Sequence, residues 1–363
     1  MLVSERETIK RGADGRPACK LGRGRLAMLF AFAAAAFFAA AVSAQASGYG
    51  SQACSTTARA GKQACKHEVK DDWWEAVGIC TNESDYADRW ECFVDAWAER
   101  KESREECGEV FEARRELCDE LGEEPYDPDF DPDDFDSDFT NLTNPNPYRP
   151  LAIGNQWSYE GGDAEITVEV MSATKLIEGV TCIVVKDVVE EDGEVIEDTD
   201  DWEAQAKDGA VHYCGEIALN FETFEGDDPE VPELVDIEGS WKAGRDGAKS
   251  GILIQAEPEV GQVYRQEWAF GDAEDVAEVL SIDYGFGDDA ELDEFVPEDL
   301  ATLLCDDDCL VTRDFTPLEP DAEERKYYAP DIGVFLEVDL ESGDIVQLVD
   351  CNVHPKCALL PTP

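Results

Sequence analysis

The fold of the N-terminal part is decided by the stretch from Cys54 to Cys118, CSTTARAGKQACKHEVKDDWWEAVGICTNESDYADRWECFVDAWAERKESREECGEVFEARRELC. Its six cysteines follow one another at steps of 11, 15, 12, 15 and 11 residues, which is a palindrome. The flanks are rich in Ala, Glu, Arg and Lys and contain no Pro, which favours helix. Between them, residues 81–85 supply turn and N-cap chemistry. The stretch therefore predicts two helices that fold back on each other near Tyr86.

Geometry selects one pairing among these cysteines. Two cysteines 11 residues apart in a helix lie about 16 Å apart along its axis, whereas a disulfide needs Cα atoms within about 7 Å. Bonds within one helix are therefore excluded, and a nested ladder keeps every bond level between antiparallel helices. The predicted disulfides are Cys54–Cys118, Cys65–Cys107 and Cys80–Cys92. We expect the following aromatic side chains to fill the seam: Trp73, Trp74, Trp90, Phe93, Trp97 and Phe111.

This cysteine pattern resembles the twin-cysteine helical hairpins, in which disulfides clamp two helices, although those typically use steps of ten residues and two bonds. The resemblance is architectural and implies no function. A zinc site at Cys65 and His67 is the alternative, but the ladder leaves no thiolate free to bind a metal.

Residues 1–46 have the pattern of a secretory signal peptide. Basic residues up to Arg25 precede an apolar run over 26–42, and small residues surround Ala44 and Ala46, the two candidate cleavage sites. An uncleaved membrane anchor is the alternative. Export to an oxidising compartment agrees with the even number of cysteines in each half of the remaining chain. We therefore predict a secreted or periplasmic protein.

The chain is strongly acidic, with 85 Asp and Glu against 29 Lys and Arg and a formal net charge of −56. Removal of the signal peptide, which contains seven basic and three acidic residues, takes the charge to about −60. Such a charge argues against nucleic acid and anionic membrane surfaces as partners and favours cations, basic proteins or simple solubility. We expect no stable membrane insertion after removal of the signal peptide.

Composition divides the rest of the chain into four segments. Residues 48–123 are the hairpin, 124–147 an acidic linker rich in Pro and Asp, 148–350 a β-rich domain, and 351–363 a C-terminal tail with a small disulfide loop. The predicted fold class is α+β in separate domains, with the disulfide-linked antiparallel helical hairpin followed by a mainly antiparallel β-meander.

Alternating residues support the β-meander. Trp202, Ala204 and Ala206 define one buried strand face, and the pairs Asp192-Gly193 and Asp208-Gly209 predict hairpin turns. We expect about nine to twelve strands, closed as a barrel or folded as a sandwich. Segments 272–280 and 290–304 are predicted to be short helices. The predicted disulfides are Cys182–Cys214, Cys305–Cys309 and Cys351–Cys357, with cross-pairing between the two small loops left open.

Several stretches of the β-rich domain are distinctive, among them 200–202, 208–216, 239–248 and 264–267. They resemble segments of a group of uncharacterised secreted bacterial proteins. The resemblance covers most of residues 148–350 and implies a shared β fold, but that group brings no known activity.

Aromatic and charged residues of these stretches form the candidate ligand-binding set, because glycan and cation sites combine aromatic platforms with carboxylates. The set comprises Trp202, Glu216, Trp241, Arg245, Asp246, Tyr264 and Glu267. The alternative is that the aromatics belong to the core and the charged residues to turns. A hydrolase would pair Asp201 or Glu216 with Glu267 as acid and base. No catalytic residue is assigned, because the three histidines fall in no known catalytic motif.

The linker offers candidate calcium ligands at Asp131, Asp133, Asp134, Asp136 and Asp138, since hard cations need several oxygens at close spacing. It lacks the Gly and the closing Glu of an EF-hand loop, and a solvated acidic linker is the alternative. Its phenylalanines offer a further possibility, that of docking on a neighbouring domain. No cofactor other than calcium is expected.

These observations predict a secreted, non-catalytic binding or structural protein of unknown ligand that acts at the cell envelope or outside the cell. The first alternative is a carboxylate-dependent hydrolase acting on glycans. The second is a calcium-binding adhesion protein.

Overall fold

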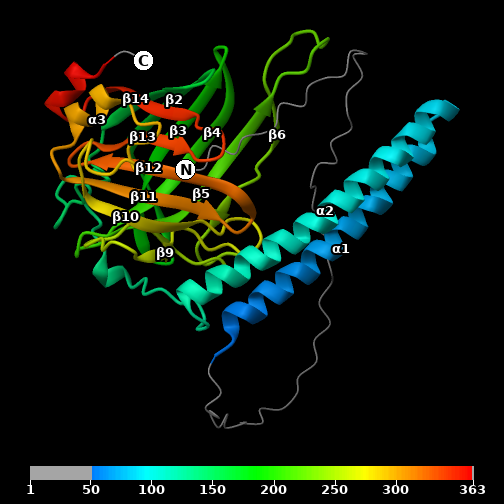
Figure 1. Ribbon diagram of the computed structural model, residues 1–363, viewed down its shortest axis with the longest axis horizontal. Helices are drawn as coiled ribbons and strands as arrows, with labels where there is room; N and C mark the ends of the chain where they lie inside the picture. The colour runs from blue at the N-terminus through cyan, green and yellow to red at the C-terminus, as the bar shows by residue number, and fades with distance from the viewer. Residues whose placement is uncertain (1–50, 362–363) are drawn as a thin grey trace. The chain divides into compact units, whose positions relative to one another are not determined.

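The computed structural model describes residues 51–361 (Figure 1). The chain forms two compact units. The first unit ends at Glu109, within the second helix, and the second unit runs from Val110 onward. The predicted fold class is confirmed, because a two-helix hairpin precedes a large antiparallel β-sheet. The predicted signal peptide, 1–46, lies outside the described residues.

Helices α1 (Ala53–Asn82) and α2 (Tyr86–Leu121) are joined by the turn Glu83-Ser84-Asp85. Asp85 caps α2, because its Oδ1 accepts hydrogen bonds from the N–H groups of Ala87 at 2.7 Å and Asp88 at 3.3 Å. The fold-back near Tyr86 is therefore confirmed, and its cause is the turn and capping chemistry of residues 83–85.

Disulfides join the helices as the palindrome predicts. Cys65 bonds to Cys107 and Cys80 to Cys92, with Cα atoms 5.8 and 5.5 Å apart. Cys54 and Cys118, the predicted outer pair, are also disulfide-bonded. Each such bond stabilises the fold by about 2–4 kcal/mol, mainly by restricting the unfolded chain.

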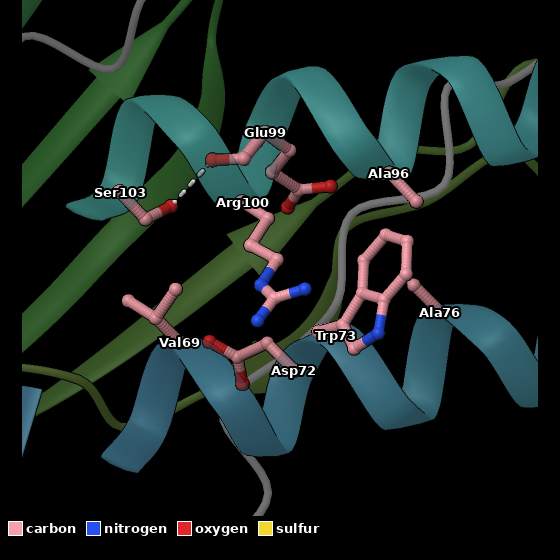
Figure 2. A pocket seen from close by; sticks show the side chains of 8 residues that line it. All are labelled: Val69, Asp72, Trp73, Ala76, Ala96, Glu99, Arg100 and Ser103. Atoms are coloured by element: carbon pink, nitrogen blue, oxygen red, sulfur yellow. Dashed lines mark hydrogen bonds between the residues drawn. The ribbon is translucent and has the colours of Figure 1, made fainter. Parts of the chain in front are cut away.

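The seam between the helices is lined by small residues. Ala76, Cys80 and Ala96 are buried there, and Trp73 packs against them partly buried. Figure 2 shows Trp73 and Arg100 at this seam, beside a cavity of about 20 Å³ that holds no more than about one water.

The prediction of an all-aromatic seam is wrong for three of its residues. Trp74, Trp90 and Trp97 are 61%, 65% and 61% exposed. Phe93 and Phe111, like Trp73, are partly buried. The disulfides hold the helix backbones so close that small side chains fill the space between them, and large side chains on the flanking positions point outward.

The second unit is built on one 14-stranded antiparallel sheet, more strands than expected. Its strands are β1 (Gln156–Gly161), β2 (Ala164–Ile177), β3 (Val180–Glu191), β4 (Glu194–Gln205), β5 (Val211–Glu222), β6 (Glu233–Asp236), β7 (Trp241–Lys242), β8 (Gly251–Ile254), β9 (Val263–Arg265), β10 (Val276–Tyr284), β11 (Cys309–Thr316), β12 (Glu319–Ala329), β13 (Gly333–Asp339) and β14 (Ile345–Cys351). The hydrogen-bonded order is β6-β5-β4-β3-β2-β1-β14-β13-β12-β11-β10-β9, with β7 and β8 paired to β5. The sheet is not closed, so the barrel alternative does not hold.

Apolar residues cover both faces of the central strands. On β3, Ile183 and Val185 join the main core cluster, whereas Cys182 and Val184 join a second cluster on the opposite face. Helix α3 (Glu298–Leu304), which falls in a predicted helical segment, adds Leu300 to the main core. The other predicted helix, 272–280, is wrong, because β10 occupies most of it and pairs with β9 and β11. The strands are thus sandwiched between two hydrophobic layers.

The three disulfides of this unit are those predicted. Cys182 bonds to Cys214, Cys305 to Cys309 and Cys351 to Cys357, with Cα atoms 6.7, 5.4 and 5.2 Å apart. Cross-pairing between the two small loops is therefore excluded. The last of these bonds ties β14 to the short 3-10 helix η2 (Pro355–Leu359).

The acidic segment 124–147 is packed on the sheet and is not a solvated linker. Phe135 and Phe139 are buried, and the ring of Phe135 lies 4.9 Å from that of His212. The N–H of Asp136 donates to the carbonyl of Gln205 at 2.9 Å. Phenylalanines among the aspartates thus dock the segment, while the short 3-10 helix η1 (Pro132–Asp134) forms one of its turns.

Candidate functional site

Part of the predicted ligand-binding set comes together at the junction of β4, β5 and β7. Strand register places Asp201 opposite Glu216, and Glu216 opposite Trp241. Glu267 lies near them, because its charge raises the pKa of Glu216. We call Asp201, Glu216 and Glu267 the carboxyl cluster. Asp201 is buried, whereas Glu216 and Glu267 are partly buried.

Tyr213 links two members of the carboxyl cluster. Its hydroxyl lies 2.5 Å from Oδ1 of Asp201 and 2.8 Å from Oε2 of Glu216. A phenol has a single hydroxyl proton, so two such contacts require a proton on one of the two carboxyls. Tyr213 also packs edge-on against Trp241, with ring centroids 5.4 Å apart. Sequence reasoning did not assign Tyr213 a role, although it lies only three residues before Glu216.

The electrostatics agree with shared protons. Burial and the charge of Glu203 raise the pKa of Asp201 to about 6. Burial and the neighbouring carboxyls raise the pKa of Glu216 well above its usual range. Burial and Asp275 do the same to Glu267, while the indole N–H of Trp241 opposes that rise. Carboxyls of the cluster therefore hold protons at pH values where exposed carboxyls are ionised.

The carboxyl cluster is better suited to stabilising the sheet than to cleaving a glycosidic bond. The contacts of Tyr213 place oxygens of Asp201 and Glu216 within about 5 Å of each other. Retaining glycosidases have two carboxyls at a similar spacing, about 5–5.5 Å, but they leave the space between them open for the sugar. Here the phenol of Tyr213 fills the space. The arrangement holds and shares protons across β4 and β5.

Trp202 shares a core cluster with Tyr213 and Trp241, whereas Tyr264, Arg245 and Asp246 lie elsewhere. Trp202 is buried, with the ammonium of Lys175 3.2 Å from its ring centroid. Tyr264 is buried in a separate core cluster and donates to the carbonyl of Leu253 at 3.3 Å. Arg245 and Asp246 pair with each other on an exposed turn. Trp202 and Tyr264 thus lie in the core, and Arg245 and Asp246 lie on a turn.

Sequence reasoning missed a set of buried charges in the second unit. Arg149 forms a two-point salt bridge with the fully buried Glu203, one contact being Nε to Oε2 at 3.0 Å. Lys326 is buried among three carboxylates, 3.8 Å from Asp314, 3.6 Å from Glu324 and 3.8 Å from Glu337. Burial would lower the pKa of Lys326, but these carboxylates outweigh it and raise that pKa. The interior thus contains buried charge pairs beside its apolar clusters.

The predicted calcium ligands serve local turns. Asp131 accepts a hydrogen bond from the N–H of Asp133 and so caps η1. Asp136 accepts from the N–H and hydroxyl of Thr143, both at 2.7 Å, and Asp138 accepts from Thr140. Asp133 and Asp134 are exposed. Among residues 51–361, no group of three or more His, Cys, Asp or Glu side chains is arranged to hold a metal ion. Nothing in this geometry favours a calcium site.

The hairpin carries the most prominent exposed aromatic surface of the described residues. Trp74, Tyr86, Trp90 and Trp97 are between 61% and 79% exposed, and Ile79 and Val94 are 46% and 49% exposed. Monomeric proteins seldom leave several large aromatics in water unless they bind something, and Trp and Tyr dominate the energetics of interfaces. The signal for this surface is in the sequence, where Tyr86, Trp90 and Trp97 recur at helical spacing.

Comparisons with known proteins leave the site to be interpreted from its own geometry. No protein-family model, no curated protein and no solved structure matches the chain. Between residues 51 and 361, moreover, no helix has the length and apolar character of a membrane span. The resemblance of residues 148–350 to uncharacterised secreted bacterial proteins stays a prediction.

Proposed function

We propose that this chain is an exported, non-catalytic binding protein that acts at the cell envelope or outside the cell. The hairpin is its binding module, and the β unit is a rigid body that carries the hairpin. The observation that carries the proposal is the exposure of Trp74, Trp90 and Trp97, each more than three-fifths open to solvent.

The construction of the hairpin supports a binding role. Its disulfides and small-residue seam hold the two helices together without these three tryptophans. Exposed aromatics on a covalently fixed scaffold lose little conformational entropy when they bind, which favours affinity. The disulfides also agree with an oxidising location outside the cytoplasm.

The buried polar side chains of the β unit support a non-catalytic function. Several of its buried polar side chains pair with one another, as in the Arg149–Glu203 salt bridge and the Tyr213 contacts to two carboxyls. Catalytic groups need access to a substrate and a specific placement around it. The carboxyl cluster instead has its donors and acceptors directed at each other.

Sedimentation with an isolated envelope fraction from the producing cells tests the proposal. We expect the purified chain to sediment with that fraction. The triple variant Trp74→Ser/Trp90→Ser/Trp97→Ser should bind at least about tenfold more weakly, because interface tryptophans commonly contribute 2 kcal/mol or more each. Circular dichroism confirms that the variant retains its helices.

The matched control removes equally exposed apolar residues from the β unit. Val231, Leu234 and Ile237 are 47%, 54% and 53% exposed, and their triple serine variant should bind like the parent chain. If the control loses binding and the tryptophan variant does not, the hairpin is not the binding module. If neither the parent nor the control associates with the envelope, the proposal is overturned.

A carboxylate-dependent hydrolase acting on glycans is the second candidate. The observation that favours it is the raised pKa of Glu216 and Glu267, since acid catalysis needs a protonated carboxyl near neutral pH. Release of reducing sugar from envelope polysaccharide by the parent chain, lost in Glu216→Gln and in Glu267→Gln, would replace the binding proposal. Activity that survives both variants would exclude the carboxyl cluster as its source.

A further inference from the structure

Helix α2 carries two stripes of opposite character over the part of its length in the first unit. One stripe is aromatic and basic and recurs every three or four residues: Tyr86, Trp90, Phe93, Trp97, Lys101 and Arg104. The other is acidic and has the same spacing: Asp88, Glu91, Asp95, Glu99, Glu102, Glu106 and Glu109. Because residues three and four apart lie on one side of a helix, the two stripes occupy different faces.

Helix α1 repeats this division. Its aromatic and basic stripe comprises Arg59, Lys66, Lys70, Trp73 and Val77. Its acidic stripe comprises Glu68, Asp72 and Glu75. The basic residues are thus segregated from the acidic ones on both helices, in a chain where acids outnumber bases by almost three to one.

Two contacts decide which stripes share a side of the hairpin. The guanidinium of Arg100, one turn beyond Trp97, lies 4.9 Å from the ring centroid of Trp73. Asp72 and Glu99, one from each acidic stripe, meet at the seam beside the cavity that Trp73 and Arg100 also line (Figure 2), and partial burial and the charges of Asp72 and Glu102 raise the pKa of Glu99. The aromatic and basic stripes therefore meet on one side, which we call the aromatic–basic face, and the acidic stripes meet on the other.

The aromatic–basic face is open to solvent. Tyr86, Trp90 and Trp97 are 79%, 65% and 61% exposed, and Lys66, Lys70 and Arg104 are exposed as well. The face therefore combines planar aromatic rings with positive charge, while the negative charge of the hairpin lies on the other side.

We propose that the aromatic–basic face docks on an anionic lipid bilayer, with the hairpin lying along the surface and its acidic face turned to water. This inference rests on the proposed function and names the partner of the part of the hairpin surface that contains Trp90 and Trp97. The basic side chains meet lipid phosphates, and the tryptophan and tyrosine rings sit at the level of the headgroups, where these residues are enriched.

The residue types favour a lipid surface over a second copy of the chain. Helices that associate with each other use Leu, Ile or Val at seam positions, whereas the α2 stripe contains Trp, Tyr and Phe with Lys and Arg. Two copies would also bring together two chains of −56 formal charge. The charge complementarity on the hairpin is to an anionic plane, because bases predominate on the aromatic side, where the acidic Glu105 is paired with Lys101.

The high net negative charge does not prevent this docking. Electrostatic interactions in physiological salt are screened beyond about 8 Å, so the charges nearest the bilayer decide its attraction. Those charges belong to Lys66, Lys70 and Arg104. The expectation that an acidic chain avoids anionic membranes follows from total charge, whereas docking depends on the charge of one face.

Flotation with vesicles tests the inference. The purified chain is mixed with vesicles of phosphatidylcholine alone or of phosphatidylcholine with phosphatidylglycerol. We expect binding at least about tenfold tighter to the anionic vesicles, since each basic residue near such a surface contributes about fivefold. Tryptophan emission should shift to shorter wavelength only when anionic vesicles are present.

Variants separate the two contributions to the binding. Lys66→Glu/Lys70→Glu/Arg104→Glu should abolish the preference for anionic vesicles. Trp90→Ser/Trp97→Ser should weaken binding at least about tenfold and remove the emission shift, because the aromatic anchors are lost. The control, Glu91→Ser/Asp95→Ser on the acidic face, should bind at least as tightly as the parent chain.

Four outcomes overturn the inference. The chain could bind both vesicle types equally, or bind neither while it still sediments with the envelope fraction. Either result rejects the anionic lipid as the partner but leaves the proposed function standing. Binding to a soluble anionic polysaccharide with none to vesicles identifies a different partner. A dimer in solution that Trp90→Ser/Trp97→Ser dissociates assigns the face to a second copy. If the parent chain does not sediment with the envelope fraction, the proposed function itself is rejected.

Discussion

The two units of this chain distribute their side chains in opposite ways. In the hairpin, the interior consists of small residues such as Ala76 and Ala96, and large aromatics such as Trp90 and Trp97 are exposed. In the β unit, aromatics such as Trp157 and Tyr327 are buried, and so are ionised or ionisable groups such as Glu203. The hairpin thus exposes large aromatics among its charged residues, and the β unit buries charged groups among its apolar ones.

The difference follows from what stabilises each unit. Two helices alone bury too little apolar surface to be stable, and disulfides supply the missing stabilisation by restricting the unfolded chain. The aromatics of the hairpin are therefore not required in its core. The β unit has hydrophobic clusters on both faces of its sheet, so it tolerates the desolvation of charges that are paired.

The largest effect is expected from breaking a buried charge pair in the β unit. Arg149→Met leaves Glu203 buried without its partner, and the free energy of unfolding should fall by about 3–5 kcal/mol. Urea denaturation of the β unit, followed by near-UV circular dichroism, measures the change.

The control for this prediction is Arg245→Met. Arg245 also contacts a carboxylate, Asp246, but both side chains are largely exposed. Exposed pairs contribute little, so the free energy of unfolding should change by less than about 0.5 kcal/mol. Equal losses in the two variants would mean that burial does not determine the contribution of a charge pair in this unit.

A smaller effect is expected from removing a disulfide of the hairpin. The Cys65–Cys107 bond closes a segment of 42 residues, and Cys80–Cys92 closes one of 12. Replacing both cysteines of a bond by serine should lower the free energy of unfolding by about 4 kcal/mol for Cys65–Cys107 and by about 3 kcal/mol for Cys80–Cys92. The longer loop loses more because its closure restricts the unfolded chain more. Protease resistance of the helices and their far-UV circular dichroism in urea measure both. A greater loss for the shorter loop would show that strain, and not loop length, governs the ladder.

Much of the fold was predictable because it depends on local spacing. The cysteine palindrome specified the hairpin and its bonds, and capping chemistry at Asp85 specified the turn. The number of strands and the form of the sheet were not predictable, because closure depends on pairing between strands far apart in sequence. Residues 276–280 were misassigned because an Ala- and Val-rich segment with acidic residues fits helix and strand alike.

The candidate sites were predictable only in part. The carboxyl cluster was found because Asp201, Glu216 and Glu267 stand out as polar residues among aromatics. The Arg149–Glu203 pair was missed, because alternation around Trp202 implied that Glu203 faces solvent, whereas the sheet is covered on both faces. The exposed tryptophans were misplaced because apolar residues are expected inside, and sequence spacing does not reveal how closely disulfides draw two helices together.

The dependence of stability on pH should distinguish the two units. Burial raises the pKa of Asp201 and of Asp275 to about 6 and that of Glu324 to about 7. In the unfolded chain these carboxyls ionise near pH 4. Ionisation therefore favours the unfolded chain as the pH rises, so their contribution to stability is complete below about pH 4 and is lost between about pH 4 and 7.

We therefore expect the melting temperature of the β unit to fall by several degrees between pH 5 and pH 8, since 1 kcal/mol corresponds to about 2–4 °C in a unit of this size. Asp201→Asn, which keeps an acceptor for Tyr213 but does not ionise, should flatten the profile. Melting curves at the tyrosine bands of the near-UV circular dichroism follow the β unit, which holds every described tyrosine except Tyr86, and the helical signal in the far UV follows the hairpin. A helical signal with the same pH dependence as the β unit would contradict the assignment to these buried carboxyls.

The smallest effect is expected where exposed aromatics of the hairpin are removed. Trp90→Ser and Trp97→Ser should each change the free energy of unfolding by less than about 0.5 kcal/mol, because both side chains are more than three-fifths exposed. Ala96→Leu, which adds bulk to the buried seam, should cost about 1–3 kcal/mol and is the matched comparison. Urea titration of the helical signal measures all three variants. If the tryptophan variants cost as much as the seam variant, the rings stabilise the hairpin and the proposed function loses its main support. If they cost little, stability does not account for large aromatics kept in water, and binding is the physical reason that remains for them.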